Sequence, residues 1–201
     1  MTKNTYSIFG FLAVTSFWIT YFIMTNLRAE YSWLYKAISE LGSLDAPNAW
    51  IWNLFGYILP GFCISVFSYG LHKEIQHANS SRWPLIGLMG SGIFMSISGI
   101  FPGDFENWQS LTMLLHTLGS FGSYSLFLIA AFTYPKQMVL SDYWKSSIVP
   151  IKVFTWLTIL FGAWPFIFTA TPAAGQRFVF FFYFAWILGM SFRLYRMNAN
   201  R

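Results

Sequence analysis

The sequence predicts an all-α, polytopic membrane protein: a single domain over residues 1–201, with six transmembrane helices in a bundle and both termini in the cytoplasm. Composition is the first observation behind this prediction. Hydrophobic residues make up 56% of the 201 residues and charged residues only 9%, whereas a soluble domain carries about a quarter charged residues to wet its surface. The second observation is a set of six apolar stretches, each long enough to cross the hydrocarbon core of a bilayer as a helix.

The six stretches are expected to be helices because a helix satisfies its backbone hydrogen bonds within itself, as lipid requires. None shows the alternation of polar and apolar residues that marks a membrane β-strand. The first stretch is too long for the apolar part of a signal peptide, and no small-residue cleavage pattern follows it, so it is expected to be a true span. The predicted spans are residues 6–26, 50–71, 84–101, 111–133, 149–170 and 178–194.

Charged residues predict the orientation, because Lys and Arg are retained on the cytoplasmic side. Six spans place both termini on one side, and nine of the twelve positive residues fall there, against Arg28, Lys36 and Arg177 on the other. The expected location is therefore the plasma (inner) membrane of a prokaryote, with cytoplasmic termini. Acidic residues are sorted the opposite way, which the insertion rule does not require, and this directs attention to the outer face. The outer acidic residues are Glu30, Glu40, Asp45, Asp104 and Glu106.

The same features exclude several classes of protein. The net charge of +5 comes from scattered basic residues without a basic run or a nucleic-acid motif, so no nucleic-acid partner is expected. The single cysteine, Cys63, lies inside an apolar stretch and is expected to be a small buried hydrophobic residue, which excludes a disulfide scaffold. The expected partners are membrane lipids, with a homo-oligomer or a larger membrane complex left open. The cofactor is unknown.

The first external loop, over residues 27–49, is the longest. Its aromatic segment 31–38 is expected to lie flat as an interfacial helix, and Gly42 and Pro47 then turn the chain into the second span. One interpretation is a re-entrant loop followed by a proline-kinked helix. The other is a cavity, since irregular backbone at membrane depth needs protein or water around it. The cavity would be lined by Ser39, Glu40 and Asn53, and Gly56, Tyr57 and Pro60 continue along the second span.

The third span is rich in small residues. Gly87 and Ser91, and likewise Gly92 and Ser96, are four residues apart, the spacing that lets membrane helices pack closely. The span ends in a Phe-Pro-Gly-Asp sequence that places Asp104 at the outer mouth of the bundle. Close helix packing is therefore expected along this span.

The fourth span carries a polar stripe. His116, Ser120 and Ser123 share one helical face, which is expected to point into the bundle. An ionisable residue at membrane depth is a functional candidate. The alternative is a neutral His116 that bonds a neighbouring helix.

The last two spans carry one break and one notable charge. Trp164-Pro165 predicts a kink in the outer half of the fifth span. Arg177 opens the sixth span and is the only positive charge in that outer loop. It is either an interfacial snorkelling anchor or a contact for an anion, since its guanidinium group presents a planar fork of donors.

Several short motifs occur together and in order: Ile38-Ser39-Glu40-Leu41-Gly42, Pro47, Asn53-x-x-Gly56, Phe101-Pro102-x-Asp104 and His116. With them the chain resembles the six-span prokaryotic family catalogued as domain of unknown function 998. More remotely it is similar to the Frag1/DRAM/Sfk1 group of eukaryotic membrane proteins. The resemblance covers most of the chain and implies the six-span fold, and the remote group implies a lipid-linked role. It assigns no role to the individual motif residues.

The first functional hypothesis is a hydrolase-like enzyme acting on a lipid or another amphiphile at the outer leaflet. Ser39 or Ser43 would be the nucleophile, His116 the general base and Asp104 the group that orients it. Alternatively, Glu40, Asp104 and His116 would bind a divalent metal that activates water, although the metal-binding helix motifs are absent from the sequence. The candidate catalytic residues are Ser39, Glu40, Asp104 and His116.

The second hypothesis is a non-catalytic small-molecule or lipid binder, transporter or sensor that uses the same outward-facing polar cavity. Pro60 and Pro165 interrupt the second and fifth spans, as broken helices do in transporters with repeated halves. The third hypothesis is a structural subunit of a membrane complex, with the glycine-rich third span as its interface. The candidate substrate-binding residues are Asp45, Asn53, Tyr57, Ser120 and Arg177.

Overall fold

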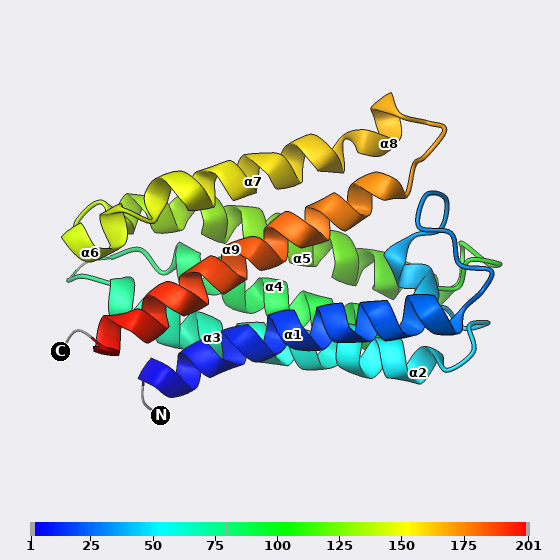
Figure 1. Cartoon of the computed structure of the whole chain (residues 1–201), viewed down its shortest axis with the longest axis horizontal. Helices are drawn as coiled ribbons and strands as arrows, with labels where there is room; N and C mark the ends of the chain where they lie inside the picture. Colours follow the sequence, from blue (N-terminus) through cyan, green and yellow to red (C-terminus); the bar gives the residue numbers. More distant parts are fainter. Residues whose placement is uncertain (1–2, 79, 200–201) are drawn as a thin grey trace.

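The computed structural model describes residues 3–78 and 80–199, and within them it contains helices and no strand. The helices form an elongated bundle (Figure 1). Six helical spans are long and apolar enough to cross a membrane, which confirms the predicted fold. They are α1 (Lys3–Leu27); the continuous run of α2 (Ala49–Ile51), η2 (Trp52–Ile58) and α3 (Leu59–Ile75); α4 (Trp83–Ile100); α5 (Leu111–Met138); α7 (Ile148–Gly162) with α8 (Trp164–Ile167); and α9 (Ala174–Ala199).

The two ends of the bundle carry different segments (Figure 1). One end holds the start of α1, the end of α9, the connection from α3 to α4 and the short helix α6 (Asp142–Lys145). The other end, called the outer end below, holds residues 28–48 with the short 3-10 helix η1 (Ile38–Gly42), and the connections 101–110 and 168–173. We call residues 28–48 the external loop. The start of α1 and the end of α9 thus share one side, as an even number of spans requires.

Directly after α2, the second span contains a π-helical segment, η2, close to the proline at which one interpretation of the sequence placed a kink. The N–H of Leu59 bonds to the carbonyl of Leu54, five residues earlier. The wider turn comes directly before Pro60, which has no N–H to donate and whose ring disturbs the preceding helical turn. The carbonyl of Phe55 in this segment accepts a hydrogen bond of 2.6 Å from Ser16 of α1. A neighbouring helix thereby satisfies a backbone group of the π segment.

Helices α3 and α4 cross at a pair of glycines. A Cβ on Gly61 would lie 2.4 Å from the carbonyl oxygen of Gly92, and a Cβ on Gly92 would lie 2.4 Å from that of Gly61. The hydroxyl of Ser65 donates to a carbonyl of α4 at 3.2 Å, and that of Ser96 donates to a carbonyl of η2 at 3.1 Å. The Gly92/Ser96 pair therefore supports close packing, as its spacing predicts.

The opposite face of α4 packs against α5. A Cβ on Gly87 would lie 2.7 Å from the backbone nitrogen of Ala130. The Ser91 hydroxyl is within hydrogen-bond distance of the hydroxyls of Ser123 on α5 (3.2 Å) and Tyr183 on α9 (3.0 Å). Helix α4 is thus held on both sides by contacts between backbones and small polar side chains.

The fifth span breaks where the sequence predicts a kink. Helix α7 ends at Gly162, and α8 begins at Trp164 with Pro165 in its first turn, where the missing proline N–H costs nothing. The indole N–H of Trp164 donates to the carbonyl of Thr171 at 2.9 Å. The span therefore ends in a short second helix whose tip is exposed, with Phe166 86% accessible.

Replacing Gly92 with alanine is expected to destabilise the bundle, because the added methyl group would lie 2.4 Å from the carbonyl oxygen of Gly61. Overpacking of this kind costs about 1–3 kcal/mol. Gly189 is the matched control, because a Cβ there meets no atom within 4 Å and alanine is the better helix former. Thermal unfolding in detergent checks both variants. A Gly92→Ala protein that melts no lower than Gly189→Ala would contradict the close crossing.

Candidate functional site

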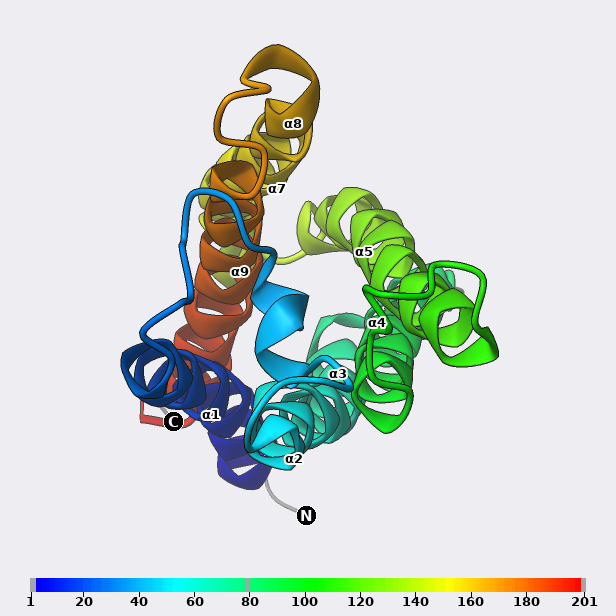
Figure 2. The ribbon, with the colours of Figure 1, turned by 90° about the vertical axis from the view of Figure 1, so that its right-hand side faces the viewer.

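The external loop folds over the outer end of the bundle. Residues 33–35 form a turn, and helical structure begins only at η1, so the interfacial helix expected over 31–38 is wrong. Seen from the outer end, η1 lies near the centre of the ring of helices (Figure 2), and Ile38 and Leu41 are fully buried there. The loop departs from a helix because distant side chains bond its backbone carbonyls.

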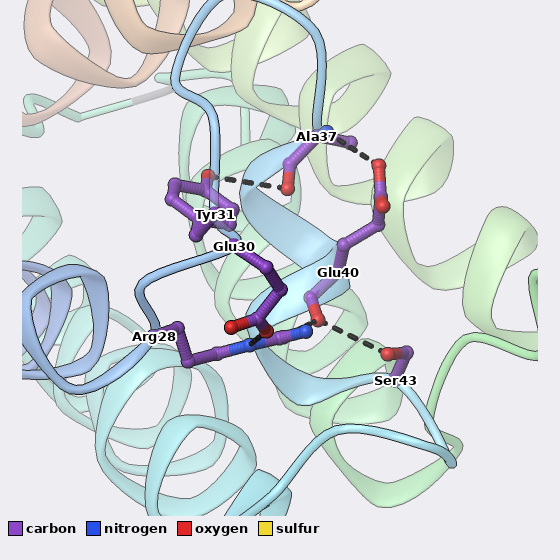
Figure 3. A network of polar contacts seen from close by, with 6 residues as sticks. All are labelled: Arg28, Glu30, Tyr31, Ala37, Glu40 and Ser43. Atoms are coloured by element: carbon purple, nitrogen blue, oxygen red, sulfur yellow. Dashed lines mark hydrogen bonds and ion pairs between the residues drawn. The ribbon is translucent and has the colours of Figure 1, made fainter.

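Arg28, directly after α1, is the first of these side chains and is only 5% exposed. Its Nε donates to Oε1 of Glu30 at 2.6 Å, and its Nη1 donates to the backbone carbonyl of Glu40 at 2.6 Å (Figure 3). A charge removed from water needs such partners. In turn, the hydrogen bond from Arg28 holds the pKa of the Glu30 carboxyl below its ordinary value.

The side chains around η1 have mainly local contacts. The Glu40 carboxylate accepts the N–H of Ala37 at 2.7 Å, and the Ser43 hydroxyl donates to the Glu40 carbonyl at 3.0 Å (Figure 3). Asp45 is exposed, and a hydrogen bond from Ser43 is the main cause that lowers the pKa of its carboxyl. Ser39 is buried, and its hydroxyl has no hydrogen-bond partner among the described residues. The Glu40 side chain therefore closes the turn that presents Ser39.

Arg177 holds the external loop from the side of α9. Its Nη2 donates to the Tyr31 hydroxyl and, at 2.5 Å, to the carbonyl of Lys36, while its Nη1 donates to the carbonyl of Ala173 at 2.6 Å. Only 9% of the residue is exposed, which is not the geometry of a snorkelling anchor. The neighbouring Gln176 accepts the first N–H of η1 at 2.7 Å. The start of α9 and the external loop are thus joined directly.

Tyr31 connects this arginine to the loop. Its hydroxyl donates to the carbonyl of Ala37 at 3.2 Å and accepts from Arg177. Burial raises the pKa of Tyr31 above its ordinary value, and the charge of Arg177 opposes this only in part. The phenol therefore stays protonated at neutral pH and does not neutralise the arginine.

Helix η2 places Asn53 and Tyr57 against the inner side of this assembly. The Nδ2 of Asn53 donates to the carbonyl of Gly42 at 2.9 Å, and its Oδ1 is buried without a partner among the described residues. A Cβ on Gly42 would lie 2.2 Å from that Oδ1, so only glycine allows this approach. Tyr57 is 2% exposed, and its ring centroid lies 6.1 Å from that of His116.

Helix α5 contributes His116, which is 4% exposed. Its Nδ1 lies 2.9 Å from the carbonyl oxygen of Ser98 and 3.0 Å from that of Phe101. Carbonyl oxygens only accept, so Nδ1 carries the proton, and in a neutral imidazole Nε2 is then an acceptor. Nε2 has no partner among the described residues. The Ser120 hydroxyl lies 3.1 Å from that of Ser98, so the polar stripe of α5 faces α4, inside the bundle.

Asp104 lies apart from this imidazole hydrogen bonding. Its Oδ1 accepts the N–H of Asn107 at 3.0 Å, within the connection 101–110. That connection meets the external loop where the N–H of Leu44 donates to the carbonyl of Gly103 at 3.0 Å. Over residues 3–78 and 80–199, no group of three His, Cys, Asp or Glu side chains could hold a metal. The alternative ligands Glu40, Asp104 and His116 are therefore not gathered into such a group.

Sequence reasoning missed Arg28, Tyr31 and Gln176 as parts of the outer end. Arg28 directly follows an apolar stretch, where a positive residue reads as a topology signal, and Tyr31 lies in a segment whose aromatic residues suggest a membrane surface. The available signal was the Gln176-Arg177 pair at the start of a span, because a positive charge is unfavourable at a helix N-terminus.

The site presents hydrogen-bonding groups rather than an assembled catalytic set. Asn53 Oδ1 and His116 Nε2 are acceptors, and the Ser39 hydroxyl is able to donate or accept. All three lack a hydrogen-bond partner among the residues described by the structure. In addition, an imidazole with a fixed tautomer is able to take up a proton from a bound molecule.

Acid is expected to loosen the external loop. The pKa values of Glu30 and Asp45 are both lowered in the folded protein, so the stability they contribute is present above their ordinary values and is lost as the pH falls through the lowered values. Glu30→Gln should reduce the acid dependence of the melting temperature, and Glu106→Gln, an exposed outer control, should not. Identical pH profiles for the wild type and Glu30→Gln would contradict this role of the Arg28–Glu30 pair.

Comparison with known proteins adds the family. A family model described as protein of unknown function (DUF998) matches residues 11–193. The chain matches no curated protein and no solved structure. The family match runs from the first membrane span into the sixth and includes the external loop and all the site residues described above. The chain therefore belongs to DUF998, a family of unknown function, and within it is a membrane protein with six apolar helices.

Proposed function

We propose that the protein binds an amphiphile from the outer leaflet in a polar cavity that opens outward beneath the external loop. The observation that carries this proposal is the set of polar groups at the outer end that lack a partner among the described residues: Asn53 Oδ1, the Ser39 hydroxyl and His116 Nε2. Of the three, Asn53 Oδ1 is the fully buried atom, and a buried polar atom without a hydrogen bond costs about 1–3 kcal/mol. A bound polar head group would supply the missing partners.

The depth of these groups supports an amphiphilic ligand. Asn53 and His116 both belong to apolar membrane-spanning helices. A ligand whose polar group reaches these side chains therefore has the rest of its structure in a lipid environment, as an amphiphile does. Polar residues inside membrane spans are expensive and mark binding sites or pathways. The π segment that carries Asn53 and Tyr57 is a further support, because such segments occur frequently at functional sites.

A hydrolase-like reaction on the same amphiphile is the second candidate. It is favoured by the orientation of His116, because two carbonyls hold Nδ1 as a donor and leave Nε2 as a base. Ser39 would be the nucleophile, since its hydroxyl is not committed to another described residue. In this version the backbone of α4 and its end replace Asp104 as the group that orients the imidazole.

Native mass spectrometry of the intact protein, purified in mild detergent, tests the proposal. The wild type is expected to retain a stoichiometric amphiphile, and Asn53→Ala and His116→Ala are expected to reduce the retained fraction by roughly tenfold, the effect of about 1.4 kcal/mol. Ser125→Ala, an exposed serine on the same helix as His116, is the control. A wild type without bound amphiphile, or equal retention in all variants, would contradict the site.

The same variants separate binding from hydrolysis. A fluorogenic ester of a fatty acid is offered to the wild type, Ser39→Ala and His116→Ala. Turnover that both substitutions abolish would favour the hydrolase-like candidate. Retention of the amphiphile without turnover would favour the binder, and turnover that survives both substitutions would exclude this pair of residues from the reaction.

We also propose that the external loop faces the outside of a prokaryotic plasma membrane and that both termini are cytoplasmic, as the distribution of Lys and Arg supports. The native Cys63 is 1% exposed, so single added cysteines report on topology. Tyr35→Cys in the exposed part of the loop should react with a membrane-impermeant maleimide in intact cells, whereas Lys145→Cys should react only after permeabilisation. The reverse pattern would overturn the orientation.

A further inference from the structure

Arg177 occupies a position where a positive charge is unfavourable. It lies in the first turn of α9, a helix of 26 residues with no acidic residue in that turn. The N-terminus of a helix carries a partial positive charge, which favours anions and disfavours cations. The guanidinium group and the end of α9 therefore add two positive contributions at one place.

Arg177 forms no ion pair with a carboxylate of the described residues. Its three hydrogen bonds go to neutral groups, the carbonyls of Ala173 and Lys36 and the Tyr31 hydroxyl, and the guanidinium group also lies over the Tyr31 ring, 5.5 Å from its centroid. Its Nε is buried without a partner, and none of its contacts within the described residues is a carboxylate. By contrast, Arg28 at the same end is paired with Glu30. A buried charge without a counter-ion is costly, so Arg177 is the group at the outer end that lacks its complement.

We infer that the amphiphile bound at the outer end carries a net negative charge on an oxyanion, a phosphate or carboxylate, and that Arg177 and the N-terminus of α9 bind that oxyanion. The inference rests on the proposed function and names its ligand class. Planar guanidinium forks match carboxylate and phosphate oxygens, and the positive end of the helix dipole at a helix start also favours such anions.

The contacts of Arg177 connect this anion site to the rest of the proposed cavity. The Nη2 bonds from Arg177 to Tyr31 and Lys36 run to the loop that covers the outer end. On the inner side of that loop, Asn53 donates to the carbonyl of Gly42, and the ring of Tyr57 neighbours that of His116. An anion near Arg177 would thus lie at the covered end, with the polar atoms of η2 and α5 on its inner side.

A loop clamp alone is the competing role for Arg177, and the two roles differ in measurable ways. A clamp stabilises the external loop whatever lipid surrounds the protein. An anion site makes both the stability and the retained lipid depend on the charge of the head group. Lys36, a half-buried cation of the same loop, is the matched control, because Lys36→Gln removes an outer positive charge and leaves the backbone carbonyl that Arg177 contacts.

The experiment uses the full chain in nanodiscs. Three lipid compositions are compared: phosphatidylcholine alone, phosphatidylcholine with phosphatidylglycerol, and phosphatidylcholine with oleate. In a fourth sample, inorganic phosphate is added to nanodiscs of phosphatidylcholine alone. Retained lipid is identified by native mass spectrometry, and stability is measured as the melting temperature. The wild type should enrich an anionic amphiphile over phosphatidylcholine by roughly tenfold, equivalent to about 1.4 kcal/mol. Lys36→Gln should keep this enrichment, Arg177→Lys should keep part of it, and Arg177→Gln should lose it.

Each outcome decides the inference. Enrichment that survives in Arg177→Gln, or a wild type that retains lipids in proportion to supply, would overturn it. Inorganic phosphate could raise the melting temperature of the wild type but not of Arg177→Gln, without any enrichment of an anionic lipid. That result would support the anion site and identify free phosphate, rather than a lipid head group, as the bound anion. If Arg177→Gln does not fold, the inference is tested by two other results: the lipid preference of the wild type and the reduction of that preference in Arg177→Lys. A wild type that retains no amphiphile defeats the proposed function itself, whereas retention of a neutral amphiphile defeats only the anion.

Discussion

Two buried guanidinium groups hold the external loop inside the outer end of the bundle, and the arrangement of the candidate site depends on them. A chain segment without regular helix leaves carbonyl groups that lipid does not satisfy. Arginine presents five N–H donors, and Arg28 and Arg177 use theirs on the carbonyls of Glu40, Lys36 and Ala173. This bonding places η1 at the centre of the outer end, where the carbonyl of Gly42 meets the side chain of Asn53.

Close backbone contacts provide the frame beneath that loop. Gly61 and Gly92 bring α3 and α4 so near that an added methyl group on either would meet a carbonyl oxygen. The same helix α4 presents the Ser98 carbonyl that holds His116. In lipid, apolar side chains gain little by leaving their surroundings, so small residues and buried hydroxyls decide how helices associate. The orientation of the imidazole is therefore a consequence of helix packing.

Irregular backbone and uncompensated polarity coincide at the outer end. The π segment η2 carries Asn53, and the start of α9 carries Arg177. Each has a buried side-chain atom with no partner in the part of the chain that the structure describes, Oδ1 in Asn53 and Nε in Arg177. Elsewhere in α4 and α5, buried hydroxyls such as Ser91 and Ser123 bond one another. Buried atoms without a partner among the described residues also occur at the opposite end, such as Gln137 Oε1 and Arg193 Nε. At the outer end it is their combination with the π segment and the start of α9 that supports a ligand.

The sequence by itself determined the six-span helical fold, the break at Trp164-Pro165 and the inward face of His116. These follow from local rules, because span length, proline chemistry and helical spacing act within one segment. Only the tertiary structure decided the path of the external loop and the roles of Glu40 and Arg177. Their partners lie in other segments: Arg177 meets Lys36 across 141 positions of the chain. No local pattern specifies such a contact, so an arginine that reads as a surface anchor becomes a buried clamp once the helices are packed.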